Sequence, residues 1–316
     1  MKIFDAHCDT IEKLSIPGNS LYESFGHCDL KRMENYQSFV QVFACCVYPE
    51  KMGMDAFLQA DNMISVFLDQ IAQNNSKILL CKNSDDVNRV FSQEKIGAIL
   101  ALEGGSPLNG NIENVDYFFN RGVRIITLTW NHRNELGVGA MTANDEGLTH
   151  FGKDVVCRMH ELGMIVDVSH LSDQGFYDVC QMDSIPFIAS HSNARAICNH
   201  PRNLSDDMIR EIIGRKGMIG FNLYAPFLSE KQPASIDHVI QHLEHILSLG
   251  GENCIGFGCD FDGMDLLPSG INGVQDLDTL CNRLLQRNHS EEFIEKITFR
   301  NFISFLHNYT QYIKIV

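Results

Sequence analysis

The stretch that decides the fold is IGAILALE, residues 96–103, which is followed by Gly104 and Gly105. It has the length and apolar composition of a buried strand, and it ends on a carboxylate where the glycines allow a sharp turn. The chain repeats this pattern of short apolar runs, several of which end near a polar side chain. The predicted strands are residues 2–7, 40–47, 96–103, 123–130, 164–170, 186–192, 218–224 and 254–260.

The alternation of these runs with segments of helical period determines the fold class. Strands separated by helices need crossover connections, which make the sheet parallel. Eight such units close into a TIM (β/α)8 barrel, here of the metal-dependent hydrolase type. Residues 77–82, KILLCK, are a candidate ninth strand. Because no linker, low-complexity tract or repeat interrupts the chain, residues 1–316 are expected to form a single TIM-barrel domain.

Composition restricts the partners and the compartment. The chain has 25 Lys and Arg residues and 40 Asp and Glu residues. It has no dense basic cluster that could neutralise a phosphate backbone, so nucleic acid is not an expected partner. The 11 cysteines lack CxxC spacing, which predicts reduced, mostly buried thiols. No apolar run or leader pattern predicts a membrane anchor, and a cytoplasmic location is expected. A homodimer is left open.

Five side chains that can bind metals lie at predicted strand ends. His7 and Asp9 follow the first strand and share a side by alternation, while Glu103, His170 and His191 each lie at or next to the end of a later strand. In a TIM barrel the carboxyl ends of all strands meet at one mouth, so these donors are expected to converge there. The sequence therefore predicts a metal site built from distant segments.

The charge and type of these donors favour two zinc ions. Three neutral imidazoles and two carboxylates only partly neutralise two divalent ions, which would let the pair hold a hydroxide near neutral pH. Imidazole and carboxylate donors without thiolate favour zinc, with manganese, cobalt and iron left open. We expect Glu103 to bridge the ions, His7 and Asp9 to bind one, and His170 and His191 to bind the other.

Three further polar residues lie near the predicted mouth. Asp260 ends the last strand, where a carboxylate could carry a proton from the attacking water to the leaving amine. Arg202 follows the strand of His191 and could pair with a substrate carboxylate, although an average loop arginine is simply solvated. Asp262 precedes a glycine and is interpreted as a turn-stabilising residue.

Two helical segments carry additional expectations. His238, His242 and His245 recur on the amphipathic segment 236–249, but no strand end accompanies them, so we interpret them as a solvated helix face. The segment 290–309 is predicted to be a helix that packs on the outside of the barrel.

Five motifs of the chain resemble, in the same order, those of the membrane (renal) dipeptidase family, metallopeptidase family M19, including its bacterial cytosolic members. They are FDAHCDT (4–10), ALEGG (101–105), MIVDVSH (164–170), SHSNARAICNHPRN (190–203) and GFGCDFDG (256–263). The resemblance runs from residue 3 to about residue 263. It implies a TIM-barrel dipeptidase that binds two zinc ions.

Residue by residue, the resemblance assigns roles to the same positions. It places the zinc ligands on His7, Asp9, Glu103, His170 and His191, with the glutamate bridging and participating in catalysis. It places the substrate-carboxylate arginine on Arg202 and the acid/base aspartate, which also contacts the substrate, on Asp260.

The chain departs from the family pattern after the fourth predicted strand. Trp130 follows Leu128 and Thr129 at the position where the family has a substrate-binding histidine. His132 or Asn131 is a candidate to take over that substrate contact. The departure concerns substrate preference and transition-state contacts, but not the metal ligands.

The resulting hypothesis is a zinc-dependent dipeptidase, in which a hydroxide bridging two metal ions attacks the peptide bond of a small dipeptide. One alternative is another binuclear metal-dependent hydrolase acting on a lactone, cyclic amide or phosphoester. A second is a non-catalytic barrel, whose signature would be missing ligands.

Overall fold

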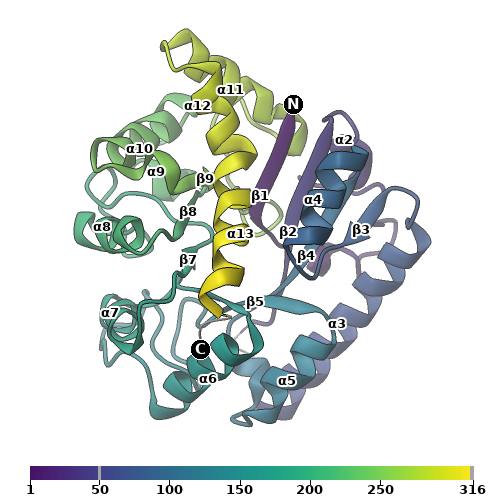
Figure 1. Cartoon of the computed structure of the whole chain (residues 1–316), viewed down its shortest axis with the longest axis vertical. Helices are drawn as coiled ribbons and strands as arrows, with labels where there is room; N and C mark the ends of the chain where they lie inside the picture. The colour runs from purple at the N-terminus through teal and green to yellow at the C-terminus, as the bar shows by residue number, and fades with distance from the viewer. Residues whose placement is uncertain (49–50, 314–316) are drawn as a thin grey trace.

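The computed structural model describes residues 1–48 and 51–313 (Figure 1). Eight parallel strands close into a barrel, because β1 pairs with both β2 and β9 while β2 pairs with β4. The predicted TIM barrel is thereby confirmed. The barrel strands are β1 (Lys2–Cys8), β2 (Ser38–Cys46), β4 (Ile96–Glu103), β5 (Val123–Thr127), β6 (Ile165–Asp167), β7 (Ile188–Ala189), β8 (Met218–Phe221) and β9 (Ile255–Phe257).

The candidate ninth strand is present and lies outside the closed ring. In β3 (Ile78–Leu80), Ile78 pairs with Ile96 at the start of β4, whereas β5 pairs with β4 only from Leu100 onward. The strands β3 and β5 therefore share one edge of β4.

Helices surround the ring of strands (Figure 1). The longer ones are α3 (Gly53–Gln73), α4 (Ser84–Gln93), α5 (Glu113–Asn120), α6 (His150–Leu162), α7 (Asp173–Met182), α8 (Asp206–Gly214), α10 (Ile236–Ser248), α11 (Leu277–Gln286) and α13 (Asn301–Ile313). The shorter ones are α1 (Thr10–Lys13), α2 (Leu30–Met33), α9 (Ala225–Leu228) and α12 (Glu291–Glu295). Among the described residues, none of these helices combines the length and apolar character that crossing a bilayer requires.

The segment 290–309 is helical as predicted, but its position differs from the prediction. Instead of joining the outer ring, α13 runs across the end of the barrel where the strands begin (Figure 1). Its aromatic residues Phe302, Phe305 and Tyr309 belong to the same apolar cluster as Phe4 and other side chains inside the barrel. The rings of Phe4 and Phe302 stack with centroids 4.6 Å apart. The helix therefore closes the barrel end opposite the strand carboxyl ends.

The interpretation of the α10 histidines as a solvated face is wrong for His242. This side chain is fully buried, its Nδ1 accepts a hydrogen bond from the Ala194 amide at 3.1 Å, and its Nε2 lies 3.0 Å from the Leu228 carbonyl. His238 and His245 are only partly buried and bond to Ser235 and Asp206. His242 therefore connects α10 to the segment after β7 and to the end of α9.

The cysteines agree with the prediction of reduced thiols. All eleven are free, and all except Cys157 and Cys180 are buried. Burial raises the pKa of the Cys254 thiol to about 11, so that side chain is an uncharged apolar group.

We predict that Phe302→Ala lowers the free energy of unfolding by about 3–5 kcal/mol, because it removes the ring that stacks on Phe4 and leaves a cavity at the closed barrel end. Urea unfolding followed by circular dichroism measures the change. Asn308→Ala, at an exposed position of the same helix, is the control and should change stability by less than about 0.5 kcal/mol. Equal effects of the two variants would contradict the role given to α13.

His242 should make stability depend on pH. Burial lowers its pKa to about 4, with the nearby His238 and His245 acting in the same direction, from an ordinary value of 6.5. Between these pH values His242 is protonated in the unfolded chain but neutral in the folded protein. The free energy of unfolding therefore falls as the pH drops from 6.5 to 4. His242→Gln should reduce this slope by up to about 1.4 kcal/mol per pH unit, whereas exposed His150→Gln should not. Unfolding curves at several pH values test the difference.

Candidate active site

Glu103 is the centre of the site and owes its position to the alternation of β4. Ile99 and Ala101 on the same strand belong to the apolar cluster inside the barrel, so Glu103 also points inward, but at the mouth. Its side chain is buried, with 2% of the residue exposed. Gly104 then adopts a positive φ of 85° and turns the chain away from the barrel axis.

An irregularity in β1 aims His7 and Asp9 at Glu103. Asp5 pairs with Gln41 but Cys8 pairs with Phe43, so β1 carries one extra residue, a local bulge. His7 is buried, and its Nε2 lies 3.5 Å from Asp9 Oδ2 and 3.6 Å from Glu103 Oε2.

The two histidines from the opposite side of the mouth reach the other oxygen of Glu103. The Nε2 atoms of His170 and His191 lie 3.1 and 3.5 Å from Glu103 Oε1. His170 has a φ of 67°, which is rare for a residue other than glycine and typical of functional sites. The structure therefore brings all five predicted ligands together around the two oxygens of Glu103.

Hydrogen bonds hold the two histidines in one orientation. His170 Nδ1 lies 2.8 Å from Asn131 Oδ1, and His191 Nδ1 lies 2.7 Å from Ser190 Oγ, which donates to Asp167 Oδ2. Partners that accept at Nδ1 place the proton there and leave the lone pair of Nε2 facing Glu103. Sequence reasoning did not identify Ser190 or Asp167, although both lie on the strand motifs that end in the histidines.

The donor set fits divalent metal ions. His7 Nε2, His191 Nε2 and Asp9 Oδ1 are buried and have no hydrogen-bond partner among the described residues. Such atoms are costly in a folded protein unless they bind something. The ligand atoms of His7, Asp9 and Glu103 lie within 4.8 Å of one another, as do those of Glu103, His170 and His191. Glu103 belongs to both groups, as a bridging ligand must.

Burial also sets the protonation of the site. It lowers the pKa of His170 to about 4, and the charge of Arg202 acts in the same direction, so this imidazole is neutral and its lone pair is available. Burial raises the pKa of Asp260 to about 6, although His7 opposes the shift.

Asp260 and Arg202 lie beside the metal-ligand cluster. Asp260 Oδ1 is 3.9 Å from His7 Nε2, and Asp260 Oδ2 accepts a hydrogen bond from Asn222 Nδ2 at 2.9 Å. Arg202 is only 4% exposed, and its Nε atom has no partner among the described residues. Its guanidinium lies 5.4 Å from the centre of the Phe227 ring and forms no ion pair within the described chain. Its Nη2 donates to the His191 carbonyl at 3.5 Å, so no carboxylate of the described chain pairs with its charge.

A cavity of about 400 Å³ opens from the cluster. Its lining includes Glu103, His170 and Asp260, together with Trp130 and Asn131. Arg202 is not part of this lining but packs against Phe227, which is. His132 is exposed and is not part of the lining either, so the structure does not bring it into the site. Asp262 lines the cavity, but its oxygens accept hydrogen bonds from Thr10 Oγ1 and the His27 amide, in agreement with a structural role.

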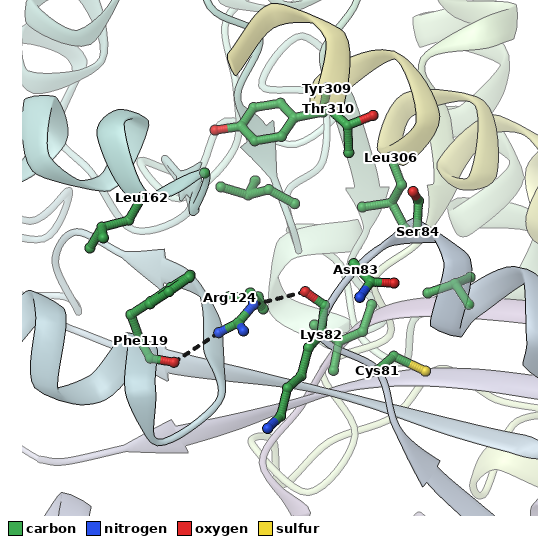
Figure 2. A pocket seen from close by; sticks show the side chains of 14 residues that line it. Cys81, Lys82, Asn83, Ser84, Phe119, Arg124, Leu162, Leu306, Tyr309 and Thr310 are labelled. Atoms are coloured by element: carbon green, nitrogen blue, oxygen red, sulfur yellow. Dashed lines mark hydrogen bonds between the residues drawn. The ribbon is translucent and has the colours of Figure 1, made fainter. Parts of the chain in front are cut away.

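A second cavity, of about 290 Å³, lies beside α13 near the closed end of the barrel (Figure 2). Most of its lining is apolar. The guanidinium of Arg124 donates to the carbonyls of Lys82, Phe119 and Val123, so it ties the surrounding turns together. This cavity therefore lacks the convergent unpartnered donors that distinguish the barrel mouth.

The chain is similar to known dipeptidases over most of its length. Residues 1–314 match the family described as membrane dipeptidase (peptidase family M19). Dipeptidase tcpJ of Claviceps purpurea is 33% identical over 298 residues, which cover 89% of this chain and 69% of the relative.

Solved structures agree with the sequence comparison. A metallopeptidase from Rhodobacter sphaeroides, liganded with a phosphinate mimic of the dipeptide L-Ala-D-Ala, is 25% identical with a TM-score of 0.90, covering 97% of this chain and 99% of that one. A structure described as dipeptidase AC, a metallopeptidase of family M19, is 27% identical with a TM-score of 0.90, covering 97% and 98%. The chain therefore belongs to the membrane dipeptidase family, peptidase family M19, and is a metallo-dipeptidase.

Proposed function

We propose that this enzyme hydrolyses dipeptides with two zinc ions held at the barrel mouth. His7 and Asp9 would hold one ion, His170 and His191 the other, and Glu103 would bridge them. The observation that carries this assignment is the pair of buried donor groups that share Glu103, with the unpartnered Nε2 atoms of His7 and His191 facing it.

The donor chemistry supports zinc. With Glu103 counted for both ions, each ion would have three imidazole or carboxylate ligands, the number typical of catalytic zinc sites that keep a position open for water or substrate. Two such ions, when bound, would lower the pKa of a water molecule and polarise the peptide carbonyl.

The remaining steps belong to side chains of the cavity. Asp260 would accept a proton from the attacking water and deliver it to the leaving nitrogen, because its carboxylate borders the metal ligands and lines the cavity. Asn222 holds Asp260 Oδ2 and leaves Oδ1 toward the cluster.

Arg202 would bind the C-terminal carboxylate of the substrate. A buried arginine without an ion pair is a strong site for a carboxylate, since burial strengthens the pairing. Only a short peptide can place its carboxylate on Arg202 and its amide at Glu103 simultaneously, which supports preference for dipeptides. The dipeptide mimic bound by the Rhodobacter sphaeroides relative has the corresponding size.

We predict that His191→Ala loses at least one of two zinc ions per chain and lowers kcat/KM for dipeptides by at least roughly a hundredfold. Metal analysis by mass spectrometry and hydrolysis of a dipeptide panel measure both effects. His307→Ala, an exposed histidine on α13, is the matched control and should keep metal and activity. Wild-type protein without bound metal, or full hydrolysis by His191→Ala, would contradict the proposed function.

We predict that Arg202→Ala raises KM for dipeptides by roughly tenfold to a hundredfold while its zinc content is unchanged, because a charge-assisted pair with the substrate is lost. A dipeptide with an amidated C-terminus lacks the carboxylate, so the variant and the wild type should hydrolyse it similarly. Steady-state kinetics with both substrates test the assignment. Loss of metal in Arg202→Ala, or equal effects on both substrates, would show that Arg202 is structural.

A further inference from the structure

Trp130 is the single tryptophan of the chain and forms one wall of the active-site cavity. Its ring is inclined by 27° to that of His170, with centroids 6.1 Å apart, and lies edge-on to the ring of Tyr48 at 5.5 Å. Tyr48 also lines the cavity, and its hydroxyl donates to Glu12. Both aromatic side chains are half-buried, and both contribute to the cavity lining.

The backbone around Trp130 is closely packed. A Cβ atom at Gly139 would lie only 2.1 Å from the Trp130 carbonyl oxygen, so only glycine fits there. The loop is held further by hydrogen bonds from the Met141 amide to the Asn131 carbonyl and from Asn134 Nδ2 to the Leu128 carbonyl. The tryptophan ring is therefore presented to the cavity by a fixed backbone.

The closed order of strands places Tyr48 opposite Arg202, with Trp130 between them around the rim. Tyr48 follows β2 and Trp130 follows β5, on either side of β4, which carries Glu103. Arg202 follows β7, which lies four places from β2 and two from β5 in the ring of eight, and it packs against Phe227, which follows β8. Glu103 and Asp260 border the space between the two sides.

This arrangement orients a dipeptide. With its carboxylate on Arg202 and its amide at Glu103 and Asp260, a dipeptide would extend its N-terminal residue toward the part of the cavity that Tyr48 and Trp130 line. Two aromatic rings gain packing contacts with an apolar or aromatic side chain, whereas an N-terminal glycine offers them almost no contact.

We propose that Trp130, together with Tyr48, forms the subsite for the N-terminal residue and selects dipeptides in which that residue is large and apolar. The inference rests on the proposed dipeptidase function and adds its substrate class. Discrimination of at least roughly tenfold is expected between a large apolar side chain and none in such a subsite.

The test compares Phe-Ala, Gly-Ala and Ala-Phe as substrates of wild type, Trp130→Ala and Trp130→Phe. Wild type should cleave Phe-Ala with the highest kcat/KM, Trp130→Ala should bring the Phe-Ala to Gly-Ala ratio close to one, and Trp130→Phe should retain most of it. Phe25→Ala removes the most exposed aromatic ring, which does not line the cavity, and should leave all ratios unchanged. Zinc content and circular dichroism establish that each variant is folded and loaded.

A second measurement uses the fluorescence of the single tryptophan. A phosphinate analogue of Phe-Ala at saturating concentration should shift the emission of Trp130, and the Gly-Ala analogue should shift it less. Because this measurement detects binding and requires no hydrolysis, it can also be made on inactive variants that retain Trp130.

The possible outcomes distinguish failure of the proposed subsite from failure of the proposed dipeptidase function. Wild type that hydrolyses none of the dipeptides overturns the proposed function, and the inference with it. Wild type that hydrolyses dipeptides without preference for Phe-Ala, or Trp130→Ala that retains the preference, overturns the inference alone. Unchanged tryptophan emission when the Phe-Ala analogue is bound also overturns the inference and leaves the dipeptidase function standing.

Discussion

The buried carboxylate of Glu103 among three imidazoles is the interaction on which the site depends. A carboxylate with 2% exposure would be strongly destabilising alone, since burial removes the water that stabilises its charge. Its neighbours His7, His170 and His191 come from β1 and from the segments that directly follow β6 and β7. They meet only because the strands close into a ring, so the chemistry of the site exists only in the folded barrel.

The two ends of the barrel have opposite characters. Where the strands begin, α13 covers the opening with Phe302 and Tyr309, and the Tyr309 hydroxyl donates to the Met164 carbonyl just before β6. Where the strands end, the inward side chains are polar and partly unpartnered. The apolar end supplies packing energy that supports the polar end, where charged and strained groups are concentrated.

The strain at the mouth is visible in the backbone. His170, Asp260 and Asp262 have φ values of 67°, 64° and 69°, a conformation that residues other than glycine rarely adopt. Hydrogen bonds from neighbouring segments fix these residues, such as Asn131 on His170 and Asn222 on Asp260. Rigid placement of this kind keeps the donor atoms in register before any ligand binds.

The sequence by itself determined the barrel and the convergence of its five candidate ligands. Both follow from local rules: apolar runs of strand length alternate with helical segments, and a polar residue at the end of a parallel strand must face the common mouth. The positions of Glu103, His170 and His191 relative to their strands were predictable for this reason. Family likeness added the roles proposed for Arg202 and Asp260, which composition and spacing left open.

Only the tertiary structure decided which distant groups touch. His242 is buried because Leu228 and Ala194, 14 and 48 residues away in the chain, cover it, and helical period describes its own helix alone. The same reason explains the bulge that redirects β1 at His7, the position of α13 across the barrel end and the exclusion of His132 from the cavity. Periodicity encodes which face of an element is apolar, whereas packing between elements decides what that face meets.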